Sequence, residues 1–224
     1  MKVTVVLTVY EAADYLQQAI DSVLGQTFRD WELVIADDGS KDPRIKEILE
    51  AIVDQRVTAF SLETTEAERR MSVRYASLIN WAVEMCDSPY VTFLCGDDFY
   101  YPDRLERMVK KLDAGHSVTY GPQALLNEDG SNYGYRPAPG VLTIAYHQVD
   151  LNSVMIRRDI FQKVGGFPTE PTDQMWREAD AHLWNRLTDA GYFFVPVDGP
   201  EPTDAKRYRD DSVDMKVRQG EVPW

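Results

Sequence analysis

Apolar residues in the first half of the chain alternate between short continuous runs and helically spaced stripes. The β-branched run Val3–Val9 is typical of a buried strand, and the residues after it place Leu16, Ile20 and Val23 on one helical face. The same alternation predicts further strands at 31–36, 57–61 and 90–94, and further helices over 45–52, 75–85 and 102–112. Strands that alternate with helices favour right-handed crossovers. We therefore expect an α/β fold with a mostly parallel sheet covered by helices on both faces.

The pattern becomes irregular after about residue 117. It predicts a strand at 117–120, a hairpin of strands 123–126 and 131–135, and a strand at 152–157. Helices are expected at 158–164 and 179–190, before a final apolar segment at 192–197. We expect a single domain over 1–197 that consists of a regular half, 1–115, and an irregular half, 116–197.

The last 27 residues differ from the rest in composition, because they carry 12 charges and three prolines but few apolar groups. This composition favours a C-terminal tail or mobile flap over 198–224, with a packed element as the alternative.

Charge narrows the range of partners. The chain has 24 Lys and Arg residues against 37 Asp and Glu residues, which gives a formal net charge of −13. A general nucleic-acid binder or a protein of anionic membrane surfaces needs a field of the opposite sign. We therefore expect neither partner, and an anionic ligand would need a local device such as a metal ion.

Several common signals are absent from the sequence. No apolar run approaches the roughly 18 to 20 residues that span a bilayer, and Val3–Val9 is followed too soon by Glu11 for a signal peptide. Cys86 and Cys95 match neither a disulfide framework nor a zinc pattern, which favours a reducing, cytoplasmic location. The Gly-x-Gly-x-x-Gly and Gly-Lys-Ser/Thr nucleotide-binding motifs are also missing.

Two acidic pairs stand where predicted strands end. Asp37-Asp38 follows the second strand and Asp97-Asp98 follows the fourth. Ligands of open α/β sheets bind outside the carboxyl ends of the strands, so both pairs are expected to face one cleft. Carboxylates crowded in this way need protonation or a cation, and Asp97-Asp98 suits Mg²⁺ or Mn²⁺. The alternative is that Asp-Asp-Gly-Ser is an ordinary turn, since turns favour these residues.

These residues also carry a family resemblance. The chain resembles the inverting family 2 glycosyltransferases of the GT-A fold in several segments, and in the later ones especially the spore-coat polysaccharide enzymes of that family. The segments are Val3–Val9 with Thr8 and Tyr10, Ser22–Phe28, Trp31–Ser40, Arg74–Asn80, Gly96–Asp98 and Tyr101–Leu105. The resemblance extends more loosely over 150–197. It implies that 1–115 binds the nucleotide sugar and that 116–197 binds the acceptor.

The resemblance also implies roles for single residues. Positions that contact the base and ribose correspond to Thr8, Tyr10 and Asp38, with Asp37 as support, and an arginine near the nucleotide and diphosphate corresponds to Arg74. In the acidic motif, Asp97 would reach the ribose and Asp98 the metal. The family's fuller motif is Asp-x-Asp-Asp, and here its first position is Cys95, which is more typical of a small buried residue than of a ligand.

Sugar transfer needs a base for the acceptor hydroxyl, neutralisation of the leaving diphosphate, and exclusion of water. Asp180 aligns with the family's catalytic acid and is our candidate base, with Glu178 and His182 as nearby competitors. Acids are also ordinary in the first turn of a helix, where the dipole favours them. Arg207 or Arg209 could close over the diphosphate.

The sequence therefore predicts a metal-dependent inverting glycosyltransferase that uses a UDP- or dTDP-sugar, a saccharide or other hydroxyl acceptor, and Mn²⁺ or Mg²⁺. Two alternatives stay open. A sugar-nucleotide pyrophosphorylase would need a glycine-rich, basic loop after the first strand, where this chain has Thr8-Val9-Tyr10-Glu11. A non-catalytic module that binds a sugar nucleotide is the second alternative, and Cys95 is the residue that favours it.

Overall fold

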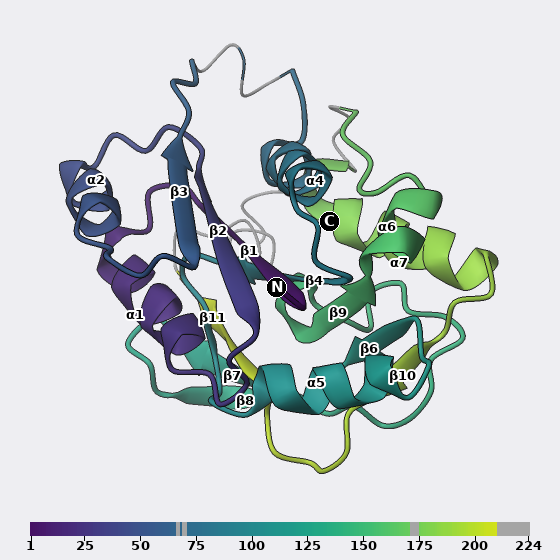
Figure 1. Ribbon diagram of the computed structural model, residues 1–224. Helices are drawn as coiled ribbons and strands as arrows, with labels where there is room; N and C mark the ends of the chain where they lie inside the picture. Colours follow the sequence, from purple (N-terminus) through teal and green to yellow (C-terminus); the bar gives the residue numbers. More distant parts are fainter. Residues whose placement is uncertain (66–67, 69–70, 171–174, 210–224) are drawn as a thin grey trace.

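A seven-stranded sheet forms the centre of the molecule in the computed structural model, which describes residues 1–65, 68, 71–170 and 175–209 (Figure 1). The strand order is β10-β6-β9-β4-β1-β2-β3. The bounds are Val3–Val9 for β1, Trp31–Asp37 for β2, Val57–Ser61 for β3, Tyr90–Cys95 for β4, Val118–Tyr120 for β6, Val154–Arg157 for β9 and Phe194–Pro196 for β10. Six of these strands lie within two residues of their predicted bounds, and β10 lies within the apolar segment expected at 192–197.

Strand β1 lies in the interior of the sheet because its side chains are mostly apolar on both faces. All seven residues of β1 are buried, and β1 pairs in parallel with β2 on one side and with β4 on the other. The pairs β2–β3 and β6–β10 are also parallel, whereas β9 runs antiparallel to its neighbours β4 and β6. The predicted, mostly parallel sheet is confirmed. Its parallel register brings the carboxyl ends of β1, β2 and β4 to one edge.

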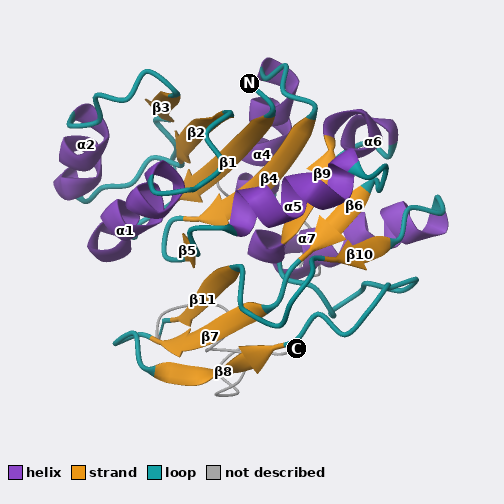
Figure 2. Ribbon diagram, turned by 60° about the horizontal axis from the view of Figure 1, so that its bottom comes forward, coloured by secondary structure: helices purple, strands orange, loops and turns teal. Residues whose placement is uncertain are grey.

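Helices cover both faces of this sheet (Figures 1 and 2). On one face, α1 (Ala13–Leu24), α2 (Pro43–Glu50) and α5 (Arg104–Asp113) pack against alternate residues of β1 such as Val5 and Leu7. On the other face, α4 (Arg74–Met85), α6 (Arg158–Lys163) and α7 (Met175–Asp189) pack around Val6 and Phe93. The period of two along β1 therefore divides the core into two layers.

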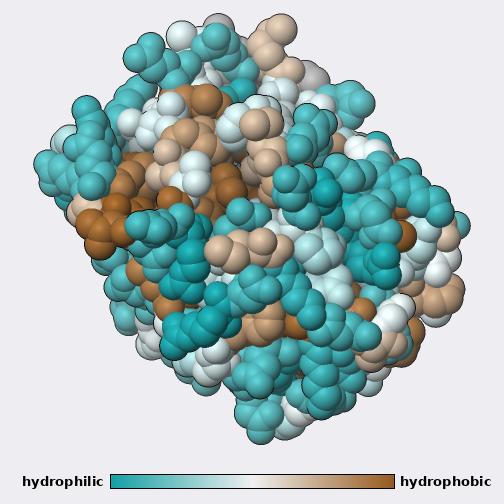
Figure 3. Space-filling model, in the orientation of Figure 1, coloured by the Kyte–Doolittle hydropathy of each residue, from teal (hydrophilic) through white to brown (hydrophobic). Residues whose placement is uncertain are grey.

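The β3 edge of the sheet is less fully covered. Apolar side chains gather on the part of the surface over α2 and β3, on a face that is otherwise largely hydrophilic (Figure 3). Between these two elements lies a groove of about 560 Å³, whose lining includes Ile45, Leu49 and Phe60. Among the described residues, no helix has the length and apolar character needed to cross a membrane.

A second, four-stranded sheet stands apart from the first (Figure 2), and two of its strands, β7 and β8, come from the irregular half of the chain. Its order is β5-β11-β7-β8, with bounds Phe99–Tyr100 for β5, Gln123–Asn127 for β7, Asn132–Arg136 for β8 and Asp204–Tyr208 for β11. Strands β7 and β8 are antiparallel and form the predicted hairpin.

Strand β11 falls within the range 198–224 that was expected to be a tail or flap. It pairs in parallel with β7 and antiparallel with β5, and Asp204, Ala205 and Tyr208 are buried. This part of the range is therefore a packed strand. Its charged residues suggested a solvated segment because their partners are far away in the sequence. Residues 210–224 lie outside the described residues.

Two further elements differ from their predicted form. The strand expected at 152–157 begins as a 3₁₀ turn at Leu151–Ser153 and becomes β9 at Val154. The helix expected at 179–190 is the second part of α7, which is kinked at Glu178 (φ −129°, ψ 17°). Both irregularities place polar residues, Asn152 and Asp180, at the edge where β1, β2 and β4 end.

Candidate functional site

The first cavity lies where β1 ends and α4 begins. It has a volume of about 350 Å³ and is lined by Thr8, Val9, Tyr10, Asp38, Arg74, Tyr75 and Leu78. The buried strand β1 delivers Thr8 and Tyr10 to this position, and the turn after β2 delivers Asp38. The structure thus brings together four residues predicted to contact the nucleotide: Thr8, Tyr10, Asp38 and Arg74.

Asp38 and Arg74 form an ion pair on the wall of this cavity. The guanidinium of Arg74 donates to Asp38 Oδ1 through Nη2 at 2.7 Å and through Nε at 3.0 Å. Nη2 also donates to Thr64 Oγ1 at 3.2 Å. Asp38 is 4% exposed, so a cation is required beside it to offset the cost of burying its charge. The pair fixes the orientation of the Asp38 carboxylate.

Asp37 has a structural environment that differs from that of Asp38. Its Oδ1 accepts hydrogen bonds from Ser40 Oγ at 2.6 Å and from Ser40 N at 3.1 Å, which closes the turn after β2. Within that turn Gly39 has φ +75°, and a Cβ at this position would lie 2.5 Å from the carbonyl oxygen of Leu62. The turn therefore requires glycine. Asp37 supports Asp38 through the backbone of this turn.

A second cavity of about 220 Å³ lies beside the first. It is lined by Tyr75, Cys95, Asp97, Asp98, Asp150, Leu151, Asn152, Asp180, Lys206 and Arg207. Tyr75 lines both cavities, so the two are neighbours across its side chain. The two predicted acidic pairs come to one edge of the sheet, but Asp38 faces the first cavity whereas Asp97 and Asp98 face the second.

Asp98 is held rigidly in this second cavity. Its Oδ2 accepts a hydrogen bond from Asn152 Nδ2 at 2.6 Å, and its Oδ1 accepts one from the backbone N–H of Arg207 at 2.6 Å. Burial, followed by the charges of Asp97 and Asp150, raises the pKa of Asp98 well above its ordinary value. Ionisation of Asp98 is therefore costly in this cavity unless a cation lies close to its carboxylate.

Asp97 is more accessible, with 24% of its side chain exposed. Burial raises its pKa, and the charge of Arg209 opposes that rise. Arg209 Nη1 lies 3.4 Å from Asp97 Oδ2. Arg209, at the end of the described chain, thus reaches the acidic pair. The expectation that Arg207 or Arg209 closes over a diphosphate stays a prediction.

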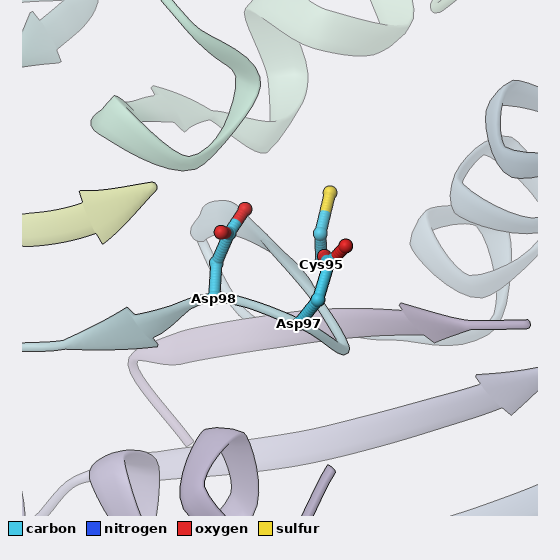
Figure 4. Close-up of side chains that lie close together, drawn as sticks. All are labelled: Cys95, Asp97 and Asp98. Carbon is cyan, nitrogen blue, oxygen red and sulfur yellow. The ribbon is translucent and has the colours of Figure 1, made fainter. Parts of the chain in front are cut away.

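The donor atoms of this cluster fit a hard divalent cation. The side chains of Cys95, Asp97 and Asp98 extend toward the same space (Figure 4), and one potential ligand atom of each lies within 4.8 Å of the others. Burial and the neighbouring acids raise the pKa of the Cys95 thiol well above its ordinary value. A protonated thiol is a poor ligand, and Mg²⁺ and Mn²⁺ prefer oxygen. Asp97 and Asp98 would therefore hold the cation, with Cys95 as a neutral neighbour.

Asp180 lines the same cavity as Asp97 and Asp98. The kink at Glu178 starts a new helical segment, and Asp180 stands in its first turn. Burial of Tyr75, followed by the charge of the nearby Asp180, raises the pKa of Tyr75 well above its ordinary value. The candidate base thus lines the same cavity as the candidate metal ligands.

The competing bases Glu178 and His182 belong to a different group of side chains. Glu178 Oε2 accepts a hydrogen bond from the Tyr146 hydroxyl, and Glu178 Oε1 lies 3.6 Å from His147 Nε2. His182 Nε2 is 4.0 Å from Glu178 Oε2. Tyr146 and His147 thus engage Glu178 beside the kink, whereas His182 Nε2 is buried with no hydrogen-bond partner among the described residues. Asp180 is the acid of this helix that lines the cavity.

Sequence reasoning missed three polar residues of the second cavity: Asp150, Asn152 and Lys206. Burial alone would raise the pKa of Asp150, but Lys206, Arg136 and hydrogen bonds hold it below its ordinary value. No local pattern marks these residues, because each acquires its role from a partner more than 50 positions away in the sequence.

A model of glycosyl transferase family 2 matches residues 4–167. This match covers well over half of the chain, so the chain belongs to glycosyl transferase family 2. Protein CgeD of Bacillus subtilis is 37% identical over 198 residues, which cover 84% of this chain and 46% of CgeD. The putative glycosyltransferase EpsE of the same organism is 26% identical over 200 residues, which cover 85% of this chain and 68% of EpsE.

Solved structures share the fold. TarS 1-349 of S. aureus in complex with UDP-GlcNAc has a TM-score of 0.71 at 17% identity, over 95% of this chain and 60% of that one. The mannosyltransferase PcManGT from Pyrobaculum calidifontis, in complex with GDP-Man and Mn²⁺, has a TM-score of 0.68 at 16% identity, over 98% of this chain and 61% of that one. The predicted GT-A fold is confirmed. The chain spans less than half the length of CgeD.

Proposed function

We propose that this chain is a metal-dependent inverting glycosyltransferase that moves a sugar from a UDP- or dTDP-sugar to the hydroxyl of a saccharide or other acceptor. The observation that carries the proposal is the shared cavity of Asp97, Asp98 and Asp180, which adjoins the cavity of Asp38 and Arg74 at Tyr75. One cavity then takes the nucleoside, and the other takes the diphosphate and the reacting carbon.

The nucleoside cavity suits a base and ribose. Its wall combines the apolar side chains of Val9 and Leu78 with an oriented carboxylate, Asp38, and the hydroxyl-bearing residues Thr8 and Tyr10. Ligand pockets of this kind are mostly apolar, with a few polar groups that fix orientation. TarS was solved in complex with UDP-GlcNAc and PcManGT in complex with GDP-Man, which supports a nucleoside diphosphate sugar here.

In the second cavity, Asp180 acts as the general base. It accepts the proton of the acceptor hydroxyl, whose oxygen attacks the anomeric carbon on the face opposite the diphosphate. A single displacement of this kind inverts the configuration and requires no protein nucleophile. Asp97 and Asp98 would hold Mn²⁺ or Mg²⁺, which supplies positive charge to the leaving diphosphate when bound.

The division of labour follows the two halves of the chain. Residues 1–115 supply Thr8, Asp38, Arg74 and the acidic pair, so we assign nucleotide-sugar binding to this half. Residues 116–197 supply Asp180, which must face the acceptor, so we assign acceptor binding to that half. The Mn²⁺ in the PcManGT complex supports the metal assignment.

A binding panel followed by turnover tests the proposal. UDP, dTDP and GDP are titrated by calorimetry with and without Mn²⁺, and transfer and donor hydrolysis are then measured for the wild type, D98N and D180N. We expect metal-dependent binding of UDP or dTDP, loss of that metal dependence in D98N, and loss of turnover with retained binding in D180N. Asp189→Asn, an exposed acid on the same helix, is the matched control.

Other outcomes would contradict the proposal in distinct ways. Wild-type binding without any turnover would identify a non-catalytic sugar-nucleotide module. Formation of a sugar nucleotide from a nucleoside triphosphate and a sugar phosphate would identify a pyrophosphorylase. If D98N and D180N turn over the donor as fast as the wild type, Asp98 is not the metal ligand and Asp180 is not the general base.

A further inference from the structure

Lys206 presents a positive charge to the cavity that contains the acidic residues. It lies on β11, whose backbone is fixed between β5 and β7. Its side chain is 21% exposed and lines the cavity together with Asp97, Asp98 and Asp180. A lysine at this depth loses part of its hydration, so its position is determined by the groups around it.

Asp150 fixes the Lys206 ammonium at the cavity wall. Lys206 Nζ lies 2.7 Å from Asp150 Oδ2, and Asp150 is 8% exposed. Asp150 is itself held in place, because its Oδ1 accepts hydrogen bonds from Gln123 Nε2 at 3.2 Å and from Asn152 Nδ2 at 3.0 Å. The ammonium is therefore placed by a rigid, buried network.

Arg207, the neighbouring basic residue of the cavity lining, directs its guanidinium elsewhere. Its Nε donates to the carbonyl oxygen of Asp97, its Nη1 to that of Glu128, and its Nη2 to Gln18 Oε1. Its guanidinium also stacks over the ring of Tyr15, 4.7 Å from the centroid. Arg207 thus faces the cavity mainly through its backbone, which holds Asp98.

The Lys206 ammonium shares this cavity wall with several acids, and one of them, Asp150, is its ion-pair partner. Four carboxylates line the cavity, namely Asp97, Asp98, Asp150 and Asp180. A dianionic diphosphate cannot enter among these acids unless cations face it.

We propose that the Lys206 ammonium, placed by Asp150, binds the diphosphate of the donor and stabilises it as the leaving group. This assignment rests on the proposed function and adds a catalytic residue to it. Lys206 serves in addition to the cation that Asp97 and Asp98 would hold, and it comes from β11 of the four-stranded sheet.

The transfer step balances with Lys206 in this role. The acceptor oxygen forms a bond to the anomeric carbon, and the bond from that carbon to the diphosphate oxygen breaks. The electron pair of the broken bond stays on the diphosphate, and the acceptor proton passes to Asp180. Lys206 keeps its protons and donates a charge-assisted hydrogen bond to the departing diphosphate.

A purely structural role would have different consequences. In that case Lys206 would serve to neutralise buried Asp150, and its removal would destabilise the fold and weaken every ligand alike. A diphosphate-binding role predicts selective loss. The affinity for a nucleoside diphosphate falls, whereas the affinity for the nucleoside, which occupies the first cavity, is retained.

The test compares K206M with the wild type in calorimetric titrations of UDP and uridine, or of dTDP and thymidine if thymine is the preferred base. Each titration is run with and without Mn²⁺. We expect K206M to weaken diphosphate binding about 10- to 100-fold, the worth of a hydrogen bond to a charged group. Nucleoside affinity should change less than about threefold. Lys110→Met is the matched control, because Lys110 is an exposed lysine on α5.

Two further variants keep the test decisive if K206M unfolds. K206R retains the charge and should recover most of the diphosphate affinity. D150N keeps the Lys206 ammonium but removes the carboxylate that holds it in place. We expect this variant to lose part of the diphosphate affinity, because the ammonium is then less well positioned. Equal losses for diphosphate and nucleoside in K206M, or unchanged diphosphate affinity, would overturn the assignment.

The outcomes also separate this inference from the function on which it rests. A wild type that binds UDP or dTDP and transfers sugar, with K206M equal to it, would overturn the role of Lys206 and leave the proposed function intact. A wild type that neither binds a nucleoside diphosphate nor transfers sugar would overturn both.

Discussion

The side-chain amide of Asn152 joins the end of strand β4 to the carboxylate of Asp98. Its Nδ2 donates to Asp98 Oδ2 at 2.6 Å, and its Oδ1 accepts from the backbone N–H of Cys95 at 2.8 Å. Asn152 is 1% exposed and stands in the 3₁₀ turn before β9. It therefore fixes the direction in which Asp98 points, although no motif marks it.

The first prediction concerns Asn152→Ala. Groups that orient a metal ligand typically contribute 10- to 100-fold to metal affinity, so we expect Mn²⁺ binding to weaken by about 10-fold. Loss of a buried partner should also lower the free energy of unfolding by about 1 to 3 kcal/mol. Calorimetric titration of Mn²⁺ and chemical denaturation measure the two effects. Asn132→Ala, at an exposed position of β8, should change neither. Unaltered Mn²⁺ affinity in Asn152→Ala would show that Asp98 needs no such orientation.

The second prediction concerns pH and Asp204 on β11. Burial, opposed by the charge of Arg104, raises the pKa of Asp204 to about 6. A carboxyl whose pKa is higher in the folded state binds more protons there, so its contribution to stability falls as the pH rises from about 4 to about 6. The loss amounts to about 2 to 3 kcal/mol at neutral pH.

Asp204→Asn should remove this pH dependence. We expect the difference in unfolding free energy between D204N and the wild type to shift in favour of D204N between pH 4 and 7, whatever its value at pH 4. Three neighbours donate hydrogen bonds to the Asp204 carboxylate, namely Gln123, Ser153 and Thr203. Replacing this carboxylate can therefore make D204N less stable than the wild type at pH 4. Chemical denaturation at several pH values gives the slope, and a difference that stays constant with pH would contradict the prediction.

The third prediction concerns Arg74→Met. It leaves the buried Asp38 carboxylate without its 2.7 Å partner, so we expect a stability loss of about 1 to 3 kcal/mol. Because this pair lies in the first cavity, both uridine and UDP should bind about 10-fold more weakly. This pattern differs from the selective diphosphate loss expected for K206M. Calorimetry with the two ligands distinguishes them, and unchanged uridine affinity in Arg74→Met would place the nucleoside elsewhere.

The sequence was sufficient for the residues whose placement depends on local pattern. Asp38 and Asp98 each follow a strand that its own apolar run identifies, and parallel strands bring such ends to one edge. The pattern could not reveal Lys206, because β11 is a strand only through its pairing with β5 and β7. It could not reveal Asn152 either, since its partner Asp98 lies 54 positions away. Charged residues look solvated in a sequence until their buried partners are known.

The last prediction concerns Cys95, which stands where the family's motif has an aspartate. Cys95→Asp adds a carboxylate within reach of Asp97 and Asp98, whose pKa values are already raised by burial. Without metal, this third charge should lower the melting temperature, by several degrees if the cost is about 1 to 2 kcal/mol. With Mn²⁺ the added oxygen becomes a ligand, so the stabilisation by the ion should exceed that of the wild type. Thermal shifts with and without Mn²⁺ test both expectations. Cys95→Ser, which removes the thiol without adding charge, should show neither effect. A Cys95→Asp protein that Mn²⁺ stabilises no more than the wild type would show that the cation lies away from this position.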